Sequence, residues 1–465
     1  MTAFQPIGAH VEAVRREARL HRLFLLIAPL LYLAYALLTP PFQTPDEHQH
    51  LFRAWQLSEF QLFGERRGDA SGGVLPGTLG QAALPEIGSL EPHASHRPVL
   101  QRPFGSDPRR LTPQDASGNS RFYDFRGAVI YSPAGYVPQV LAIWIGKTIR
   151  LSVEDIVRLG RLLNAALAIF LIHRALRVTP VGASVFLFIG LLPMTAAASA
   201  AFGQDGLVIG GACLITATGL RTAFRKAPRT GDLLVTTLVA MLLTLSKLFY
   251  LPLALIGGQP VVGKRIQLQR LAPYLAICLA AATLAAVWLV ANSRAVVAPW
   301  PDIPPATHTL ASWFQHPIEF PGLLERTYIG HGSTLLGSLF MFGWLNVPAM
   351  SAAVFLTLIA LGLLFLAGEP GAYRLSLPMR LWLLGSGLLV WFLISLVAGL
   401  YWTPASMDSI PGLQGRYFIP IAPALLIALL PARYAATNFT RLIPVMMVGA
   451  NLAALASIGR AFYSF

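Results

Sequence analysis

The segment "TPDEHQH", Thr44 to His50, places two carboxylates and two imidazoles directly after a run of about twenty apolar residues, the length of a membrane span. An acid at the mouth of a helical bundle is a functional candidate, because charge is costly beside the membrane interior. Asp46 is therefore a candidate functional residue.

The neighbours of Asp46 have a structural explanation. Thr44 is a suitable N-cap, Pro45 suits the first helical position, and Glu47 then completes a capping box. An acid in the first turn also favours the positive end of the helix dipole. We expect Thr44 and Glu47 to fix the start of a helix and to leave Asp46 free.

The two histidines of this segment stand at i and i+2, which is a poor spacing for metal ligation from a helix. We expect both His48 and His50 to lie on a polar helix face. His50 is also a candidate for contact with a substrate. No metal site is favoured here, and the weaker alternative is a divalent ion held by Asp46 and Asp205.

Four further polar residues stand at the ends of apolar runs: Asp205 in "FGQDG", Lys247 in "LSKLFY", and Arg416 with Tyr417 in "LQGRYFIP". Each has a structural alternative. The aspartate could cap a helix, the lysine could extend to the membrane surface, and the Arg-Tyr pair could be an interfacial anchor. Under the topology described below, all four lie on the same side of the membrane as Asp46. This convergence favours a single site.

A second basic group follows the start of another apolar run. Arg158, Arg161 and Asn164 are spaced i, i+3 and i+6, so they share one helix face. Two interpretations remain open for this face. It could bind substrate, or its arginines could pair with Asp155 and neighbouring acids.

The composition indicates a multi-pass helical membrane protein. Of the 465 residues, 55% are hydrophobic and only 12% are charged, and the mean hydropathy is +0.59. The net charge of +14 does not indicate nucleic acid binding, because the basic residues fall mostly in short gaps between apolar runs. Cys213 and Cys278 lie within apolar runs, so we expect buried free thiols and neither a disulfide nor a zinc site.

The order of apolar runs predicts an all-α bundle of about eleven spans in one integral membrane domain, residues 1–465. The predicted runs cover residues 23–39, 158–173, 182–202, 206–220, 231–246, 248–262, 271–291, 348–367, 381–402, 417–431 and 442–459. A basic N-terminal tail and basic alternate loops place the N-terminus in the cytoplasm. The assignment depends on reading 231–262 as two spans, because one long span would place every later loop on the opposite side of the membrane. The first span has no processing site before it and is read as a retained anchor.

Two extracytoplasmic segments are long, 40–157 and 292–347. The first begins with a predicted helix, "DEHQHLFRAWQLSEFQLF", and continues with a flexible stretch at about 64–127. "YSPAGYVPQVLAIWIGKTI" is apolar but contains Pro133 and Pro138. We predict that it forms a helix on or partly in the membrane surface instead of a span.

An ordered set of motifs resembles the GT-C superfamily of glycosyltransferases, which use polyprenyl-phosphate sugars. The set comprises "PPFQTPDEHQHLFRAWQL", "YSPAGYVPQ", "RLLNA", "QDG", "SKLFYLPL", "FGWLNVP" and "QGRYFIPIAP". More closely, it resembles a largely uncharacterised bacterial multi-pass family grouped with that superfamily. The resemblance implies a helical membrane enzyme whose first outer loop carries a catalytic acid and membrane-surface helices.

Carried onto this chain, the resemblance implies that Asp46 is the base for an inverting sugar transfer. It implies that Arg416, with Lys247 and Tyr417, binds the phosphate of the donor, because a guanidinium offers bidentate donors. Asp205, Arg158, Arg161 and His50 are further candidates for substrate binding. No cofactor is required, and a divalent metal is not favoured, since "GQDG" holds a single acid.

The implied partners are a polyprenyl-phosphate sugar and a saccharide, lipid or protein acceptor, within membrane lipid and without nucleic acid. The implied location is the bacterial cytoplasmic (inner) membrane, with the site facing the periplasm or exterior. Two other functions stay open: a transporter or flippase of a lipid-linked saccharide, and a non-catalytic assembly subunit. A transporter should carry ionisable residues near the middle of its spans, whereas the acids here gather toward one side.

Overall fold

A computed structural model describes residues 7–87, 112, 119–225, 227–262, 265–298, 309–367, 375–404, 407–431 and 439–463. The longer helices are α1 Ile7–Leu38, α2 Glu47–Ser58, α3 Gly77–Ile87, α5 Val137–Thr148, α6 Val153–Val178, α9 Asp205–Ala223, α10 Thr230–Ser246, α11 Ala272–Ala291, α15 Ser351–Ala367, α16 Leu377–Tyr401 and α18 Phe439–Phe462. Shorter ones are α4 Arg126–Val129, α7 Ala183–Gly190, α8 Pro193–Ser199, α12 Leu310–Gln315, α13 Glu319–Glu325, α14 Gly332–Gly337 and α17 Ala422–Leu429. Three 3-10 helices matter for the site: η2 Pro133–Tyr136, η3 Leu248–Gly258 and η8 Gly415–Ile421.

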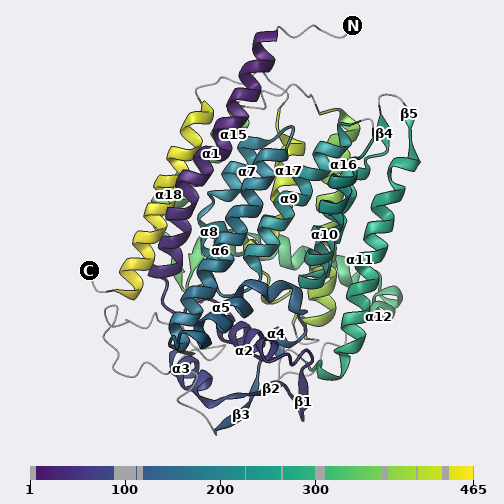
Figure 1. Ribbon diagram of the computed structural model, residues 1–465. Coiled ribbons are helices and arrows are strands. Elements are labelled where there is room, and N and C mark those ends of the chain that lie inside the picture. Colours follow the sequence, from purple (N-terminus) through teal and green to yellow (C-terminus); the bar gives the residue numbers. More distant parts are fainter. Residues whose placement is uncertain are drawn as a thin grey trace.

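The bundle has two distinct ends. Figure 1 shows α2, α3 and the strands β1 Glu65–Arg67, β2 Ala70–Pro76 and β3 Ser120–Asp124 at one end, here called the α2 end. The short hairpin β4 Val261–Val262 and β5 Arg265–Ile266 lies at the opposite, β4–β5 end. Arginines at the β4–β5 end bind helix termini: Arg270 donates to the carbonyl oxygens of Ala223 and Arg225, and Arg380 to that of Leu430. These contacts satisfy carbonyls that a helix leaves unpaired at its C-terminus.

The mostly helical membrane class is confirmed, but the count of about eleven spans is not. Six described helices are long and apolar enough to cross a membrane. They are Leu20–Leu38, Val153–Val178, Asp205–Ala223, Leu268–Ala291, Leu377–Tyr401 and Thr440–Phe462. Four predicted runs form shorter apolar helices, and the run 182–202 is split into α7 and α8. The split has a local cause: Leu192 precedes Pro193 and takes an extended backbone, as residues before proline do.

The stretch 231–262 turns back at Lys247, as the two-span reading predicted. Lys247 pairs with Asp205 at the start of α9, and Gly257 lies against Gly219 near the end of α9. The ten residues from Lys247 to Gly257 rise roughly 20 Å as a 3-10 helix. The fourteen residues from Asp205 to Gly219 rise about 21 Å as an α-helix. The return pass therefore covers the same distance as Asp205–Gly219 of α9 with fewer residues.

The stretch predicted as flexible, about 64–127, contains regular structure. Strands β1, β2 and β3 form an antiparallel sheet with Gly72 opposite both Glu65 and Asp124. An added side chain at Gly72 would come 1.8 Å from the carbonyl oxygen of Tyr123, so this glycine permits the close strand pairing. The glycines that suggested flexibility instead serve the sheet. The part of this stretch at 88–111 and 113–118 lies outside the described residues.

The apolar stretch after this sheet forms η2 and α5. Pro133 opens η2, Ser132 caps it, and Pro138 lies in the first turn of α5, so both prolines begin helices. Along α5 and its C-cap, every fourth side chain from Val137 through Leu141 and Ile145 to Ile149 is exposed and apolar. This stripe is the pattern expected of a helix at a membrane surface.

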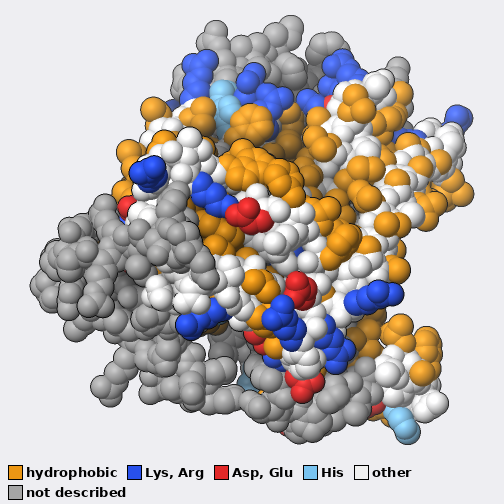
Figure 2. Space-filling model, turned by 60° about the horizontal axis from the view of Figure 1, so that its bottom comes forward, with side chains coloured by type: hydrophobic (Ala, Val, Ile, Leu, Met, Phe, Trp, Pro, Cys, Tyr) orange, Lys and Arg blue, Asp and Glu red, His pale blue; other side chains and the backbone are white. Residues whose placement is uncertain are grey.

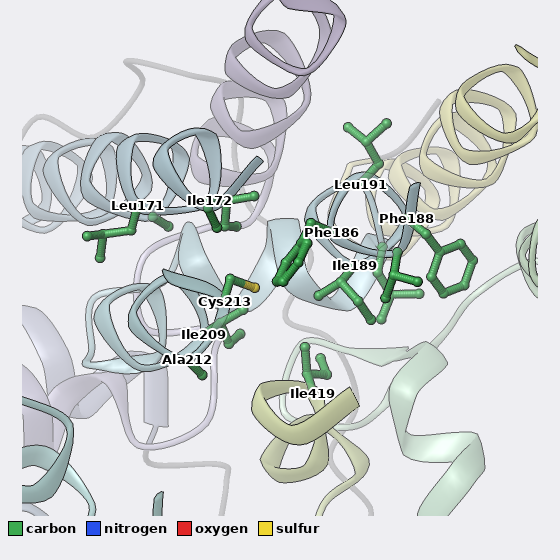
Figure 3. Packing of buried hydrophobic residues seen from close by; sticks show 14 of the residues in the cluster. Leu171, Ile172, Phe186, Phe188, Ile189, Leu191, Ile209, Ala212, Cys213 and Ile419 are labelled. Carbon is green, nitrogen blue, oxygen red and sulfur yellow. The ribbon is translucent and has the colours of Figure 1, made fainter. Parts of the chain in front are cut away.

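The core joins the first, middle and last parts of the chain. Figure 3 shows Ile172 of α6, Phe186 of α7 and Cys213 of α9 packed together, with Ile419 of η8 beside them. Cys213 is a buried free thiol, as predicted, whereas the free thiol of Cys278 is only partly buried. Close packing of this kind fixes the relative positions of the helix ends.

The reversal at Lys247 predicts that the loops before α10 and after η3 lie on the same side of the membrane, because two passes separate them. In a chain with Cys213 and Cys278 replaced by alanine, single cysteines would be introduced at Thr230 and Ile266, with Pro411 as a position on the opposite side. An impermeant thiol reagent should label Thr230 and Ile266 from the same side of sealed vesicles and Pro411 from the other. Labelling of Thr230 and Ile266 from opposite sides would contradict the two-pass arrangement of α10 and η3.

Candidate functional site

A buried ion pair organises the α2 end. The side chains of Glu47 and Arg161 are both fully buried and form two parallel hydrogen bonds, Arg161 Nε to Glu47 Oε1 at 2.7 Å and Nη2 to Oε2 at 2.6 Å. The Glu47 carboxylate also accepts hydrogen bonds from the backbone N–H groups of Phe42 (2.7 Å) and Phe202 (2.9 Å). A buried charge pair is tolerated when its other hydrogen bonds are also made.

Arg161 also binds the chain that leaves α1. Its Nη1 donates to the carbonyl oxygens of Ala36 (3.1 Å) and Thr39, and its Nη2 donates to that of Pro40 at 2.9 Å. The ion pair thus joins the end of α1, the start of α2, the middle of α6 and the loop before α9. Arg161 is occupied by these contacts, so its predicted role in substrate binding is not supported by its position.

The predicted capping box at the start of α2 is wrong. The helix begins at Glu47, its N-cap is Asp46, and no side chain caps it. The Thr44 hydroxyl is buried and has no partner among the described residues. The physical reason is the charge on Arg161, because a buried carboxylate is stabilised far more by a guanidinium than by a backbone N–H.

Asp46 adopts a left-handed backbone conformation, with φ 62° and ψ 9°. Aspartate tolerates this region better than most residues, because its short side chain bonds locally. Its carboxylate accepts a long hydrogen bond of 3.4 Å from Gln49 and remains half-buried. Burial raises the pKa of Asp46; the charges of Arg416 and Lys247 oppose the rise, and that of Asp205 adds to it. Asp46 therefore belongs electrostatically to the group formed by these three residues.

That group is the site cluster, defined as Asp46, Asp205, Lys247, Arg416 and Tyr417. Lys247 Nζ donates to Asp205 Oδ1 at 2.9 Å, and Arg416 Nε lies 3.8 Å from Asp205 Oδ2. The Tyr417 ring centroid is 5.1 Å from Lys247 Nζ and 5.6 Å from Arg416 Cζ. Arg416 Nε is buried without a hydrogen-bond partner among the described residues. The cluster therefore contains a donor that a bound anion could satisfy.

The structural alternatives for these residues do not match their positions. Asp205 is the first residue of α9, but the N-cap is Gln204 and no side chain caps the helix. Lys247 is 12% exposed and paired, so it does not extend to the membrane surface. Arg416 is 13% exposed and faces Asp205. Among the residues that the structure describes, no group of three or more His, Cys, Asp or Glu is placed to hold a metal ion.

An aromatic wall of His50, Tyr131 and Tyr136 lies beside the cluster, and of these three residues sequence reasoning named only His50. His50 of α2 stacks on Tyr131, with ring centroids 6.0 Å apart, and its Nδ1 lies 2.7 Å from the hydroxyl of Tyr136. Burial lowers the pKa of His50 to about 4, although the charge of Asp205 opposes this, so His50 is neutral at pH 7. The buried side chain of Arg53 donates a hydrogen bond from Nη2 to the Tyr131 carbonyl oxygen at 2.9 Å. The tyrosines of "YSPAGY" were the available signal.

Arg158 and Trp344 occupy supporting positions. Arg158 pairs with Asp155 at 2.7 Å and with Glu154 at 3.7 Å, which is the structural alternative left open for it. Trp344 stands in the turn between β6 Met341–Phe342 and β7 Val347–Pro348 and donates to the Phe42 carbonyl oxygen at 2.8 Å. The second long segment, 292–347, therefore ends against the connection between α1 and α2.

Figure 2 turns the α2 end forward and shows charged side chains of both signs among hydrophobic ones. A family model described as "Predicted membrane protein (DUF2142)" matches residues 30–425 of the chain. This range includes every residue of the site cluster. The comparisons with curated proteins and with solved structures gave no match.

The ion pair predicts unequal effects for two neighbouring arginines of α6. Arg161→Met should lower the free energy of unfolding by about 3–5 kcal/mol, because it leaves Glu47 buried and unpaired. Arg158→Met, on the same helix and partly exposed, should cost roughly 1 kcal/mol or less. Thermal unfolding of the two purified variants in one detergent measures the difference. Equal melting temperatures would show that the pair does not hold the α2 end together.

Proposed function

The chain belongs to the family described as predicted membrane proteins (DUF2142), and from this premise we propose that it is an inverting membrane glycosyltransferase. The donor is a sugar linked to a polyprenyl phosphate, and the acceptor is an extracytoplasmic saccharide, lipid or protein. The observation that carries the proposal is the site cluster. Four segments far apart in the sequence bring two acids and two cations together at one end of an apolar bundle.

The charges suit the two halves of such a reaction. The acceptor hydroxyl oxygen attacks the anomeric carbon while the bond from that carbon to the phosphate oxygen breaks, and the configuration inverts. The acceptor proton passes to the carboxylate of Asp46, which acts as general base. The electron pair of the broken bond leaves with the lipid phosphate, whose charge Arg416 and Lys247 stabilise.

Asp205 and Tyr417 position the two cations in this mechanism. Asp205 holds Lys247 at 2.9 Å and faces Arg416, so both side chains are ordered before a phosphate binds. Such preorganisation is what electrostatic stabilisation of a leaving group requires. The aromatic wall of Tyr131, Tyr136 and His50 supplies flat surfaces beside Asp46 that suit a sugar ring.

The proposed topology has about eleven passes in the bacterial inner membrane, with the N-terminus in the cytoplasm and the α2 end facing the periplasm or exterior. Arginines at the β4–β5 end support this orientation through the positive-inside bias. To the six long helices this proposal adds five shorter passes: α7–α8, α10, η3, α15 and η8–α17. Among the residues described, the cluster lies at the ends of its helices, which favours a transferase over a flippase with a path through the bundle.

The direct test is transfer by the purified chain in lipid nanodiscs. A radiolabelled sugar on a polyprenyl phosphate would be supplied with a set of acceptors, including cell-envelope polysaccharide and a lipid extract. Release of polyprenyl phosphate together with label in the acceptor supports the transferase. Movement of intact donor across liposomes without release would support the flippase instead.

Asp46→Asn should reduce the transfer rate by about 100- to 10,000-fold, the usual contribution of a general base. The melting temperature should stay near that of the parent, because asparagine also tolerates the left-handed backbone. Glu59→Gln, an acid-to-amide change at the exposed end of α2, is the matched control and should keep activity. Parental turnover by Asp46→Asn would move the base elsewhere, and Asp205 would be tested next.

Arg416→Lys should lose most transfer activity although the positive charge is kept. An ammonium group is a point charge and cannot reproduce the fork of donors that a guanidinium offers to a phosphate. Initial rates at saturating donor, together with binding of polyprenyl phosphate, measure the change. Full activity of the lysine variant would show that Arg416 makes no bidentate contact with the donor phosphate. Arg380→Lys, at the opposite end of the bundle, controls for general effects of the substitution.

A further inference from the structure

Three exposed arginines meet at the β4–β5 end of the bundle, where α1 and α6 pack against each other. Arg22 lies in the first turn of the apolar stretch Leu20–Leu38, and Arg174 and Arg177 lie in the last two turns of α6. Figure 1 shows α1 beginning at this end. Within the part of the chain that the structure describes, none of the three makes a hydrogen bond or an ion pair. We call these residues the arginine cluster of α1 and α6.

A histidine pair lies within the arginine cluster. The rings of His21 from α1 and His173 from α6 meet edge to face, with their centroids 5.1 Å apart. Arg22 and Arg177 are close enough for their charges to act on the first ring, and Arg174 and Arg177 are close enough to act on the second. The Nδ1 atoms of both rings are buried and have no hydrogen-bond partner among the described residues. Buried polar atoms normally have a partner. An oxygen atom of a bound anion is a partner that an imidazole N–H and a guanidinium can share.

Other arginines at the same end are occupied within the protein. Arg221 and Arg225 both pair with Asp232, and Arg270 and Arg380 donate to backbone carbonyl oxygens. The bias of basic residues toward cytoplasmic loops accounts for the number of arginines at this end. It does not require three of them to converge, unpaired, on two adjacent helices. Such convergence is typical of an anion-binding site.

The surroundings of the arginine cluster favour the headgroup of a lipid over a soluble anion. Leu26 of α1 and Phe170 of α6 are 71% and 57% exposed. Leu26 follows Arg22 by four residues and Phe170 precedes Arg174 by four, so each apolar side chain lies one turn farther along the bundle on the helix face of its arginine. Cations at the ends of two spans, with exposed apolar side chains next to them, match the phosphate and the acyl chains of a phospholipid.

We propose that the arginine cluster binds an anionic phospholipid through its phosphate groups, with the acyl chains lying over Leu26 and Phe170. Three guanidinium groups suit a lipid with two phosphates, such as diphosphatidylglycerol, better than a lipid with one. The arginine cluster lies at the end of the bundle opposite to the site cluster, so this inference does not depend on transfer activity. Only the assignment of the lipid to the cytoplasmic leaflet rests on the proposed topology.

Lipid-dependent thermal unfolding of the full-length chain tests the site. The parent and Arg174→Gln/Arg177→Gln, purified in one detergent, would be titrated with tetraoleoyl diphosphatidylglycerol, with dioleoyl phosphatidylcholine and with inorganic pyrophosphate. We expect diphosphatidylglycerol to raise the melting temperature of the parent. The double variant should need about tenfold more of this lipid for the same rise, because two of the phosphate contacts are lost. Arg22→Gln, on the other helix, should weaken the response in the same direction. Both variants should melt like the parent without lipid, since the replaced side chains are exposed.

Arg229→Gln/Arg265→Gln is the matched control. Both arginines are exposed at the same end of the bundle, but they lie at the start of α10 and on β5. This variant loses the same charge and should respond to diphosphatidylglycerol like the parent. A tenfold loss in the control as well would show general attraction to a basic surface and overturn the site. An equal rise of the parent's melting temperature with pyrophosphate or with phosphatidylcholine would also overturn the proposal, because the ligand would then be a soluble anion or any lipid.

Discussion

The arrangement of the α2 end depends on the buried pair of Glu47 and Arg161. Neither side chain has contact with water, and together they bind backbone groups at the end of α1, before α2 and before α9. Removing two charges from water is expensive unless nearly every lone pair and proton finds a partner. Because the partners lie on four segments, the pair is stable only when all four are correctly placed. It therefore fixes the loop from which Asp205 emerges and the turn that carries Asp46.

Arg161 and Arg416, two buried arginines of this end, differ in how many of their hydrogen bonds are made within the protein. Every guanidinium nitrogen of Arg161 has a protein partner. Arg416 lies against Asp205 at 3.8 Å and keeps a buried Nε without a hydrogen bond among the described residues. A saturated pair contributes to the architecture, whereas an incomplete one keeps a donor that a ligand could satisfy. This difference, more than burial, is the reason to propose Arg416 instead of Arg161 for the contact with the donor phosphate.

Sequence reasoning could predict the gathering of Asp46, Asp205, Lys247 and Arg416, because alternation of basic loops and the length of apolar runs fix which residues share an end. It could not distinguish Glu47 as a buried partner of Arg161 from Glu47 as a helix cap. The capping-box pattern is local, and the competing guanidinium is 114 residues away. The sheet formed by β1, β2 and β3 was missed for a similar reason, since its glycines permit either mobility or close strand approach. Tertiary contacts decided both cases.

Two 3-10 helices, η3 and η8, explain the positions of Lys247 and Arg416. An α-helix of the eleven residues in η3 would rise about 16 Å, whereas the 3-10 form rises about 22 Å. The longer rise lets a short apolar run return past α9 and leaves Lys247 at the turn, level with Asp205. Arg416 likewise stands in the first turn of a 3-10 helix, η8, before the chain becomes α17. Lys247 and Arg416 therefore both stand at the start of a 3-10 helix, in which each residue advances farther along the bundle than in an α-helix.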